Sequence, residues 1–246
     1  MPFETASLKA LVFDVGGTVF DWHGSIQEEV EALAKERGVV CDGSAFAIDW
    51  RQRMFALLEQ MRAGQLPRTN ADGLHRQGLD EILPDYPELQ LTPGDRDELN
   101  TVWHRLRVWP DFPTALDGLR ADFTVIVLTV LSWAIVVDSS KRCGLSWDGI
   151  LSCEFLSEYK PDPGAYLSAV GLLRVRPDQA MMVAAHPGDL RAAARVGYRT
   201  AFVARDERSQ SDTHAAAYFG DDPTDTPFDV SVDTFSELVA KLDELR

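Results

Sequence analysis

A single carboxylate follows the first apolar segment of the chain, at a position that suits a reactive side chain. The segment Ala10-Leu11-Val12-Phe13 ends on Asp14, and the turn Gly16-Gly17-Thr18 comes next. A buried strand offers no polar side chain of its own, so chemistry is expected where the strand ends and the backbone bends. Asp14 is therefore a candidate nucleophile. The alternative is that Asp14 only caps a turn, because Asp and Gly are the usual turn residues.

Three further polar groups follow later apolar segments, namely residues 129–132, Lys160 and residues 186–189. The charge of Lys160 would keep the Asp14 carboxylate ionised and hence nucleophilic, and Asp189 is suited to hold Lys160 or a water molecule. Thr18 and the backbone of Gly17 can donate hydrogen bonds to the nucleophile or the substrate. Taken singly, Lys160 is more often a solvated surface lysine and Asp189 a helix cap. Their shared position at strand ends favours one common site.

Alternating apolar strands and helices predict the scaffold that would bring these groups together. Strands are expected at residues 10–13, 123–128, 149–152, 180–185 and 200–203, with helices starting near Ser132, after Asp162, and after residues 186–189. Asp162 is a natural N-cap before Pro163. This order predicts an α/β fold with a doubly wound parallel sheet, Rossmann-like, whose ligands bind at the carboxyl ends of the strands. A last helix is expected at residues 234–245.

The segment 23–108 differs from the rest because it carries no strand-like alternation. Ser25 can cap a helix that Gly38 ends, and further helices are expected at 44–62, 74–83 and 95–106. We therefore predict two domains: a catalytic α/β core of residues 1–22 and 109–246, and an all-helical cap of residues 23–108 inserted after the first strand. The acidic, Pro-rich segment 206–228 is expected to be a surface excursion.

Composition excludes several classes of partner. The 246 residues include 24 Lys and Arg against 39 Asp and Glu, a formal charge of -15. This balance argues against nucleic acids and anionic membranes, so a negative substrate needs a local basic site. No apolar run approaches the roughly 18 residues of a membrane span, and no signal peptide is recognisable, so a cytoplasmic protein is expected. Cys41, Cys143 and Cys153 lack metal-ligand spacing and are expected to be reduced thiols.

The order of these motifs resembles the haloacid dehalogenase superfamily over almost the whole chain. Within it, the chain looks most like the type II (L-)2-haloacid dehalogenases. The matching motifs are F-D-V-G-G-T-V-F-D-W at 13–22, W-R-Q-R at 50–53, Y-K-P-D-P at 159–163 with Tyr166 following, and A-A-H-P-G-D at 184–189. W-R on a cap helix is specific to the dehalogenase branch, where the Arg meets the substrate carboxylate or the leaving halide.

The resemblance also separates attack on carbon from attack on phosphorus. Phosphatases of this superfamily hold Mg²⁺ with an extra Asp in the last motif and use a second Asp two residues after the nucleophile. Those positions are Ala185 and Gly16 here. Mg²⁺ requires oxygen ligands, which the Ala185 side chain does not offer. We therefore expect a metal-independent hydrolase without a cofactor.

The resemblance implies a two-step mechanism on a small anionic carboxylate. Asp14 attacks the α-carbon of a 2-haloacid and forms an aspartyl ester, and water positioned by Asp189 and Lys160 then releases the inverted 2-hydroxy acid. Backbone N–H groups near Thr18 and Leu131 would orient the substrate, and Arg51 would hold the departing anion or the carboxylate. The substrate-binding set implied by the motifs comprises Gly16, Trp22, Arg51, Thr129, Val130, Leu131, Ser132, Tyr166 and His186.

Three positions depart from the dehalogenase pattern. Gly16 replaces an aromatic residue, Val130 replaces an Asn that usually helps to hold the halide, and His186 replaces an Asn. These departures leave two alternatives open: ring-opening hydrolysis of azetidine-2-carboxylate on the same scaffold, and a phosphatase-like or non-catalytic small-anion binder. A homodimer is implied by analogy, with Trp103, Trp109 or Met54 as interface residues or, alternatively, as core residues.

Overall fold

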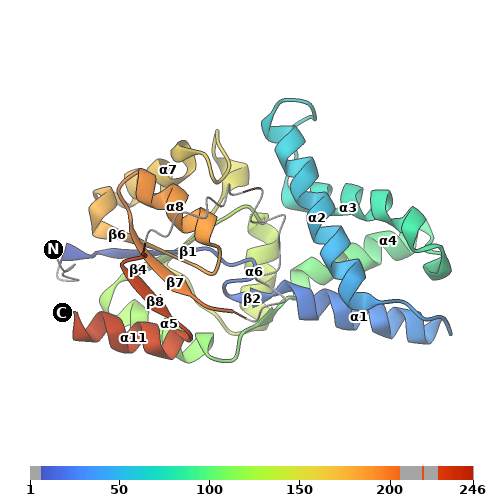
Figure 1. Cartoon of the computed structure of the whole chain (residues 1–246), viewed down its shortest axis with the longest axis horizontal. Helices are drawn as coiled ribbons and strands as arrows, with labels where there is room; N and C mark the ends of the chain where they lie inside the picture. Colours follow the sequence, from blue (N-terminus) through green and yellow to red (C-terminus); the bar gives the residue numbers. More distant parts are fainter. Residues whose placement is uncertain (1–6, 206–217, 219–226, 246) are drawn as a thin grey trace.

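A six-stranded parallel sheet forms the centre of the computed structural model, which describes residues 7–205, 218 and 227–245 (Figure 1). The strand order is β5-β4-β1-β6-β7-β8, so β1 is central and the chain winds first to one side of it and then to the other. The strands are β1 (Ala10–Phe13), β4 (Thr124–Thr129), β5 (Gly149–Ser152), β6 (Ala180–Ala184), β7 (Arg199–Val203) and β8 (Val230–Val232). The predicted doubly wound sheet is therefore confirmed.

Helices cover both faces of the sheet, which explains why the central strands β1 and β6 are apolar and buried along their whole length. In β1, Leu11 and Phe13 face one layer, whereas Ala10 and Val12 face the other. The first layer consists of α5 (Phe112–Asp122), α6 (Trp133–Arg142) and α11 (Phe235–Glu244). The second layer consists of α7 (Pro163–Leu173) and α8 (Pro187–Arg195), on the opposite side of the sheet in Figure 1. The sequence did not predict α5 or β8.

A group of helices lies to one side of the sheet (Figure 1). Along the chain, these helices come after β2 (Phe20–Asp21) and before β3 (Arg107–Val108). Its elements are α1 (Trp22–Glu36), α2 (Gly43–Arg62), α3 (Ala71–Ile82), η2 (Leu83–Asp85), η3 (Pro87–Leu89), α4 (Pro93–Asn100) and η4 (Thr101–Arg105). The short strands β2 and β3 pair in antiparallel fashion, with Phe20 opposite Val108 and Asp21 opposite Arg107. The expectation of helix as far as Val108 was therefore wrong at its end, because two residues are too few to show alternation.

The start of α1 also differs from the prediction. The N-cap is Asp21, whose Oδ1 accepts a hydrogen bond of 2.8 Å from the Gly24 backbone N–H. Ser25 lies inside the first turn, where its hydroxyl donates to the Asp21 carbonyl and accepts from the Arg107 N–H at 3.0 Å. Ser25 therefore links the helix to β3, and the sequence-based assignment of Ser25 as the cap was wrong.

Ion pairs join the helical group to the core. Asp162 stands at the N-cap of α7 but makes no capping hydrogen bond; its Oδ2 accepts from Arg62 Nε of α2 at 3.1 Å. His104 of η4 bridges Asp72 of α3, at 2.5 Å, and Asp138 of α6, at 2.7 Å. The hydrogen bond to Asp72 raises the pKa of His104, burial opposes this, and Asp138 adds to the rise. His104 therefore links α3 to α6 through these two carboxylates.

Two of the three residues considered for a dimer interface belong to the core. Met54 and Trp103 are each 1% exposed. Trp109 is half-buried, and its indole Nε1 donates to the Gly17 carbonyl at 2.9 Å. None of the helices in the described part of the chain is long and apolar enough to cross a membrane. Most of the expected surface excursion at 206–228 lies outside the described residues.

Candidate active site

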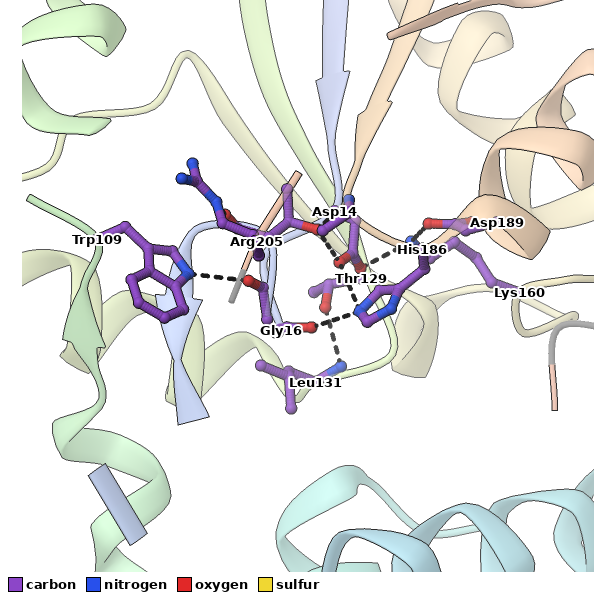
Figure 2. Close-up of polar contacts among 12 residues, drawn as sticks. Asp14, Gly16, Trp109, Thr129, Leu131, Lys160, His186, Asp189 and Arg205 are labelled. Atoms are coloured by element: carbon purple, nitrogen blue, oxygen red, sulfur yellow. Dashed lines mark hydrogen bonds and ion pairs between the residues drawn. The ribbon is translucent and has the colours of Figure 1, made fainter. Parts of the chain in front are cut away.

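The parallel register brings the polar groups to one edge of the sheet. Phe13 of β1 pairs with Val127 of β4 and with Val183 of β6, so the three strands end at a similar level. Asp14 follows β1, and Thr129 ends β4 (Figure 2). His186 and Asp189 follow β6, and Lys160 enters from the loop before α7. In Figure 2, Lys160 and Asp189 lie on one side of Asp14 and the turn at Gly16 on the other.

Asp14 is buried and surrounded by donors. Its Oδ1 accepts from Lys160 Nζ at 3.1 Å, and its Oδ2 accepts from Thr18 Oγ1 at 2.7 Å. His186 Nε2 lies 3.8 Å from Oδ2. Burial by itself raises the pKa of Asp14, but the charges of Lys160 and His186 and the bond from Thr18 outweigh it, so the pKa is lowered. Asp14 is therefore held as a carboxylate in a buried site.

Lys160 lies between two carboxylates rather than on the surface. Its side chain is fully buried, and Nζ donates to Asp189 Oδ2 at 2.7 Å as well as to Asp14. Burial lowers the pKa of Lys160, whereas the charges of Asp14 and Asp189 raise it more strongly, so the net shift is upward. The surface-lysine alternative is excluded, and Lys160 carries a fixed positive charge beside Asp14.

The pKa of Asp189 is shifted in the opposite direction to that of Asp14. It is fully buried at the start of α8 and also accepts from Tyr166 Oη at 2.5 Å. Burial raises the pKa of Asp189, the Asp14 charge raises it further, and Lys160 only partly offsets both. A pair of carboxylates whose pKa values are pushed apart can divide the roles of nucleophile and base. Tyr166, which the resemblance places at the substrate, donates this hydrogen bond to Asp189.

Side chains hold three successive carbonyls of the turn after β1. His186 Nε2 is 2.9 Å from the Gly16 oxygen, Trp109 donates to Gly17, and Arg205 Nε donates to the Thr18 oxygen at 3.0 Å. Gly17 has a φ of 96°, which favours glycine. The sequence did not assign Trp109 or Arg205 to the site. Arg205 follows β7, so the strand-end rule that selected Asp14 could have found it.

The loop after β4 is tied together internally. The Leu131 N–H, expected to orient substrate, donates to Thr129 Oγ1 at 3.1 Å, and the Leu131 carbonyl accepts from Ser152 Oγ at 2.7 Å. Ser132 caps α6 through its contact with the Ile135 N–H at 3.4 Å. Val130 is 6% exposed and its side chain carries no donor.

Arg51 reaches the same edge of the sheet from α2. It is 2% exposed, and its guanidinium carbon lies 4.6 Å from the ring centroid of Phe55 and 5.1 Å from that of Trp22. A Cβ atom added to Gly16 would lie 3.2 Å from Arg51 Nη2. The glycine therefore leaves room for the guanidinium beside the turn, where an aromatic side chain would displace it.

Comparison with known proteins identifies the family. A model of haloacid dehalogenase-like hydrolases matches residues 8–197. The chain belongs to the haloacid dehalogenase-like hydrolases. This match confirms the resemblance to the haloacid dehalogenase superfamily that the motifs indicated, and it confirms the expectation of a hydrolase.

Several dehalogenases in this family are similar to the chain over most of its length. An (S)-2-haloacid dehalogenase of Burkholderia cepacia is 29% identical, over 81% of this chain and 84% of its own. The crystal structure of an L-2-haloacid dehalogenase has a TM-score of 0.86 and 32% identity, covering 96% of this chain and 99% of that one. The crystal structure of a defluorinating L-2-haloacid dehalogenase has a TM-score of 0.84 and 31% identity, and the match covers 99% of this chain and 100% of that one.

This haloacid dehalogenase-like hydrolase thus has a site with two parts. Asp14, Thr18, Lys160 and Asp189 form one hydrogen-bonded cluster, with His186 beside it. Arg51 and Trp22 form the part that lies toward the helical group. Among the residues for which a placement is described, no three His, Cys, Asp or Glu side chains gather as a metal-ligand set.

Proposed function

We propose that this hydrolase dehalogenates (S)-2-haloacids through an ester on Asp14. The observation that carries the proposal is the buried Asp14 carboxylate, whose pKa is lowered, with the Lys160 ammonium 3.1 Å from one oxygen. The names of the similar proteins, (S)- or L-2-haloacid dehalogenases, support this reaction over the alternatives. The substrate is a small carboxylate with a halogen on the α-carbon.

In the first step, an Asp14 oxygen attacks the α-carbon opposite the carbon–halogen bond. The C–O bond forms, the carbon–halogen bond breaks, and its electron pair leaves with the halide. No proton moves in this step, so the nucleophile must be ionised beforehand. The positive charge of Lys160 and the hydroxyl of Thr18 meet this requirement because they stabilise the Asp14 carboxylate.

In the second step, water attacks the carbonyl carbon of the Asp14 ester. Asp189 takes the proton from water, a role that fits its raised pKa. Lys160, between the two residues, stabilises the oxyanion on the Asp14 carbonyl. The acyl C–O bond then breaks, the product alkoxide takes up the proton that Asp189 holds, and the second water proton leaves Asp14 for solvent, so Asp14 is regenerated as a carboxylate. The α-carbon has been inverted once.

We also propose that residues 23–108 act as a cap domain over a core of 1–22 and 109–246. The cap supplies Arg51, which holds the substrate carboxylate or the halide through its planar set of donors. Ring opening of azetidine-2-carboxylate is the second candidate, motivated by the missing amide at Val130. Phosphoryl transfer has less support, because Ala185 carries no carboxylate and its backbone N–H binds Thr18 Oγ1 at 3.0 Å.

Two measurements test this proposal. Ion chromatography should detect chloride or fluoride released from (S)-2-chloropropionate or fluoroacetate, in parallel with amine detection after incubation with azetidine-2-carboxylate. A single turnover in ¹⁸O-water, followed by mass spectrometry of the peptide that contains Asp14, should place one ¹⁸O atom in Asp14. Asp14→Asn is the negative control. Halide release without label in Asp14 would exclude the ester mechanism, and absence of any product would favour a non-catalytic binder.

We propose a homodimer by analogy with similar enzymes. Its interface cannot use Met54 or Trp103, which are buried within the chain. Light scattering coupled to gel filtration would show a mass near twice 27.3 kDa if the proposal holds.

A further inference from the structure

The indole N–H of Trp22 is a buried donor that nothing in the described chain accepts. Trp22 is 1% exposed, and its Nε1 atom has no hydrogen-bond partner among the described residues. A buried donor without a partner destabilises the fold, because it has given up its hydrogen bonds to water. Buried polar groups are otherwise nearly always paired, so an unpaired one beside a reaction site points to a ligand.

The position of Trp22 places this donor beside the turn that follows the reacting carboxylate. A Cβ atom added to Gly17 would lie 3.3 Å from Trp22 Nε1 and 3.2 Å from His186 Nε2. Gly17 belongs to the turn that follows Asp14, and His186 Nε2 is 3.8 Å from Asp14 Oδ2. The indole N–H therefore borders the turn that joins Asp14 to Thr18.

The Arg51 guanidinium covers the Trp22 ring. Their separation of 5.1 Å from guanidinium carbon to ring centroid is within the range of a cation–π contact. The guanidinium supplies positive charge, and the indole supplies a directional N–H donor. Together they make a small site for an anion beside the Gly16–Gly17 turn. The Val130 side chain carries no donor, whereas the dehalogenase pattern has an amide at position 130, so a donor to the leaving group has to come from another residue.

We infer that Trp22 donates its indole N–H to the leaving halide, and so determines which halogen this enzyme expels. The inference rests on the proposed dehalogenation. As the carbon–halogen bond breaks, its electron pair and the negative charge move to the halogen. A donor fixed at that point stabilises the transition state more than the neutral substrate. Fluoride gains most, because it is the smallest halide and accepts the strongest hydrogen bond. The indole keeps its proton throughout.

The test compares Trp22→Phe with a matched control, Trp103→Phe. Trp22→Phe keeps an aromatic ring against Arg51 but removes the N–H group and makes the ring smaller, and Trp103→Phe makes the same change of size. Trp103 carries an equally buried indole N–H without a partner, with its ring centroid 5.9 Å from the Arg51 guanidinium carbon. Its ring stacks on His75, at 3.7 Å between centroids. Loss of the Trp103 N–H should therefore leave leaving-group preference within about twofold of wild type.

Trp22→Phe should lower kcat/KM roughly 10- to 100-fold for the fluoro substrate, the size expected for a hydrogen bond to a charged group. The loss for the bromo substrate should be clearly smaller. Inhibition by added chloride should weaken, whereas inhibition by propionate, which has a carboxylate but no halogen, should not change. Weaker propionate inhibition with unchanged chloride inhibition would overturn the inference and assign Trp22 to the carboxylate. Equal losses for all halogens would overturn it as well. Absence of halide release by the wild type would instead refute the proposed function.

Discussion

Lys160→Met should leave two buried carboxylates without their shared cation. In the wild type, Nζ lies 3.1 Å from Asp14 and 2.7 Å from Asp189, and the lysine side chain is fully buried. Met has a similar length and fits the channel that the lysine stem occupies, so the substitution mainly removes the charge. The two carboxylates then repel each other in a region of low dielectric constant.

The expected loss of stability is large for a single substitution. Removing one partner from a buried ion pair costs roughly 3–5 kcal/mol. For a chain of this size, 1 kcal/mol corresponds to roughly 2–4 °C in Tm, so the variant should melt roughly 6–20 °C lower at pH 8. Adding Asp14→Asn to the variant removes one of the two repelling charges. The double variant should therefore be more stable than Lys160→Met alone.

The pH dependence provides a second readout with a defined sign. In the wild type, the lowered pKa of Asp14 contributes stability above the unfolded pKa of about 3.9 and loses it as the pH falls through the folded pKa. Without Lys160, burial and repulsion raise the folded pKa of the carboxylates. Each such group then destabilises the fold above pH ~3.9, and more so as the pH rises. The difference in Tm between Lys160→Met and the wild type should therefore be larger at pH 8 than at pH 5.

Thermal unfolding by circular dichroism at pH 5 and pH 8 would measure both effects. Lys241→Met is the matched control, because Lys241 is half-exposed and its pair with Glu244 at 3.0 Å lies on the surface. Surface pairs contribute roughly 0–1 kcal/mol, so this control should melt within about 2–4 °C of wild type. If Lys160→Met is as stable as Lys241→Met at pH 8, the buried ion-pair account of the site is refuted.

Three further predictions follow from the contacts described above. Asp189→Asn should slow hydrolysis of the ester on Asp14, so the intact mass of the protein should rise by one substrate residue during turnover; a mass that never rises would remove Asp189 from the second step. In a denaturant titration, Gly24→Ala should lower the unfolding free energy by about 1–2 kcal/mol, because the new methyl group would collide with the carboxylate that caps α1. Gly171→Ala is the control: it has open space around it and should be neutral or stabilising in the same titration. His104→Gln should lower Tm most below pH ~6.5 and least at high pH, since a raised histidine pKa contributes stability that is lost as the pH rises through the folded value; a pH-independent difference would contradict this assignment.

The sheet and the main cluster could be predicted because both depend on local pattern and topology. Short apolar segments separated by helices define a parallel sheet, and a parallel sheet has all its carboxyl ends at one edge. Asp14, Lys160 and Asp189 could therefore be expected near one another although they are far apart in sequence. Elements with weaker patterns, such as α5 and the three-residue strand β8, were missed.

The finer partners could not be predicted because several donors compete for the same acceptors. Asp162 has the sequence of a helix cap, yet its carboxylate accepts hydrogen bonds from Arg62 and none from the helix backbone. Tyr166 matches a family position near the substrate, but its hydroxyl binds Asp189. The contact of Arg51 with Trp22 joins α2 to α1, so it depends on how these two helices pack. Such choices follow from three-dimensional distances, which residue spacing does not contain.

The pairing of β2 with β3 has a consequence for how this protein could be rebuilt. Asp21 and Arg107 are opposite each other in an antiparallel pair, and Cα atoms in such a pair are about 4.5–5.5 Å apart. The chain between them therefore leaves and returns at the same place. A two-residue hairpin turn could close that gap. A shortened chain would keep the sheet together with Asp14, Lys160 and Asp189 but would lose Arg51 and Trp22. Grafting a different helical insert onto this one pair of residues would exchange substrate preference while the covalent chemistry stays in place.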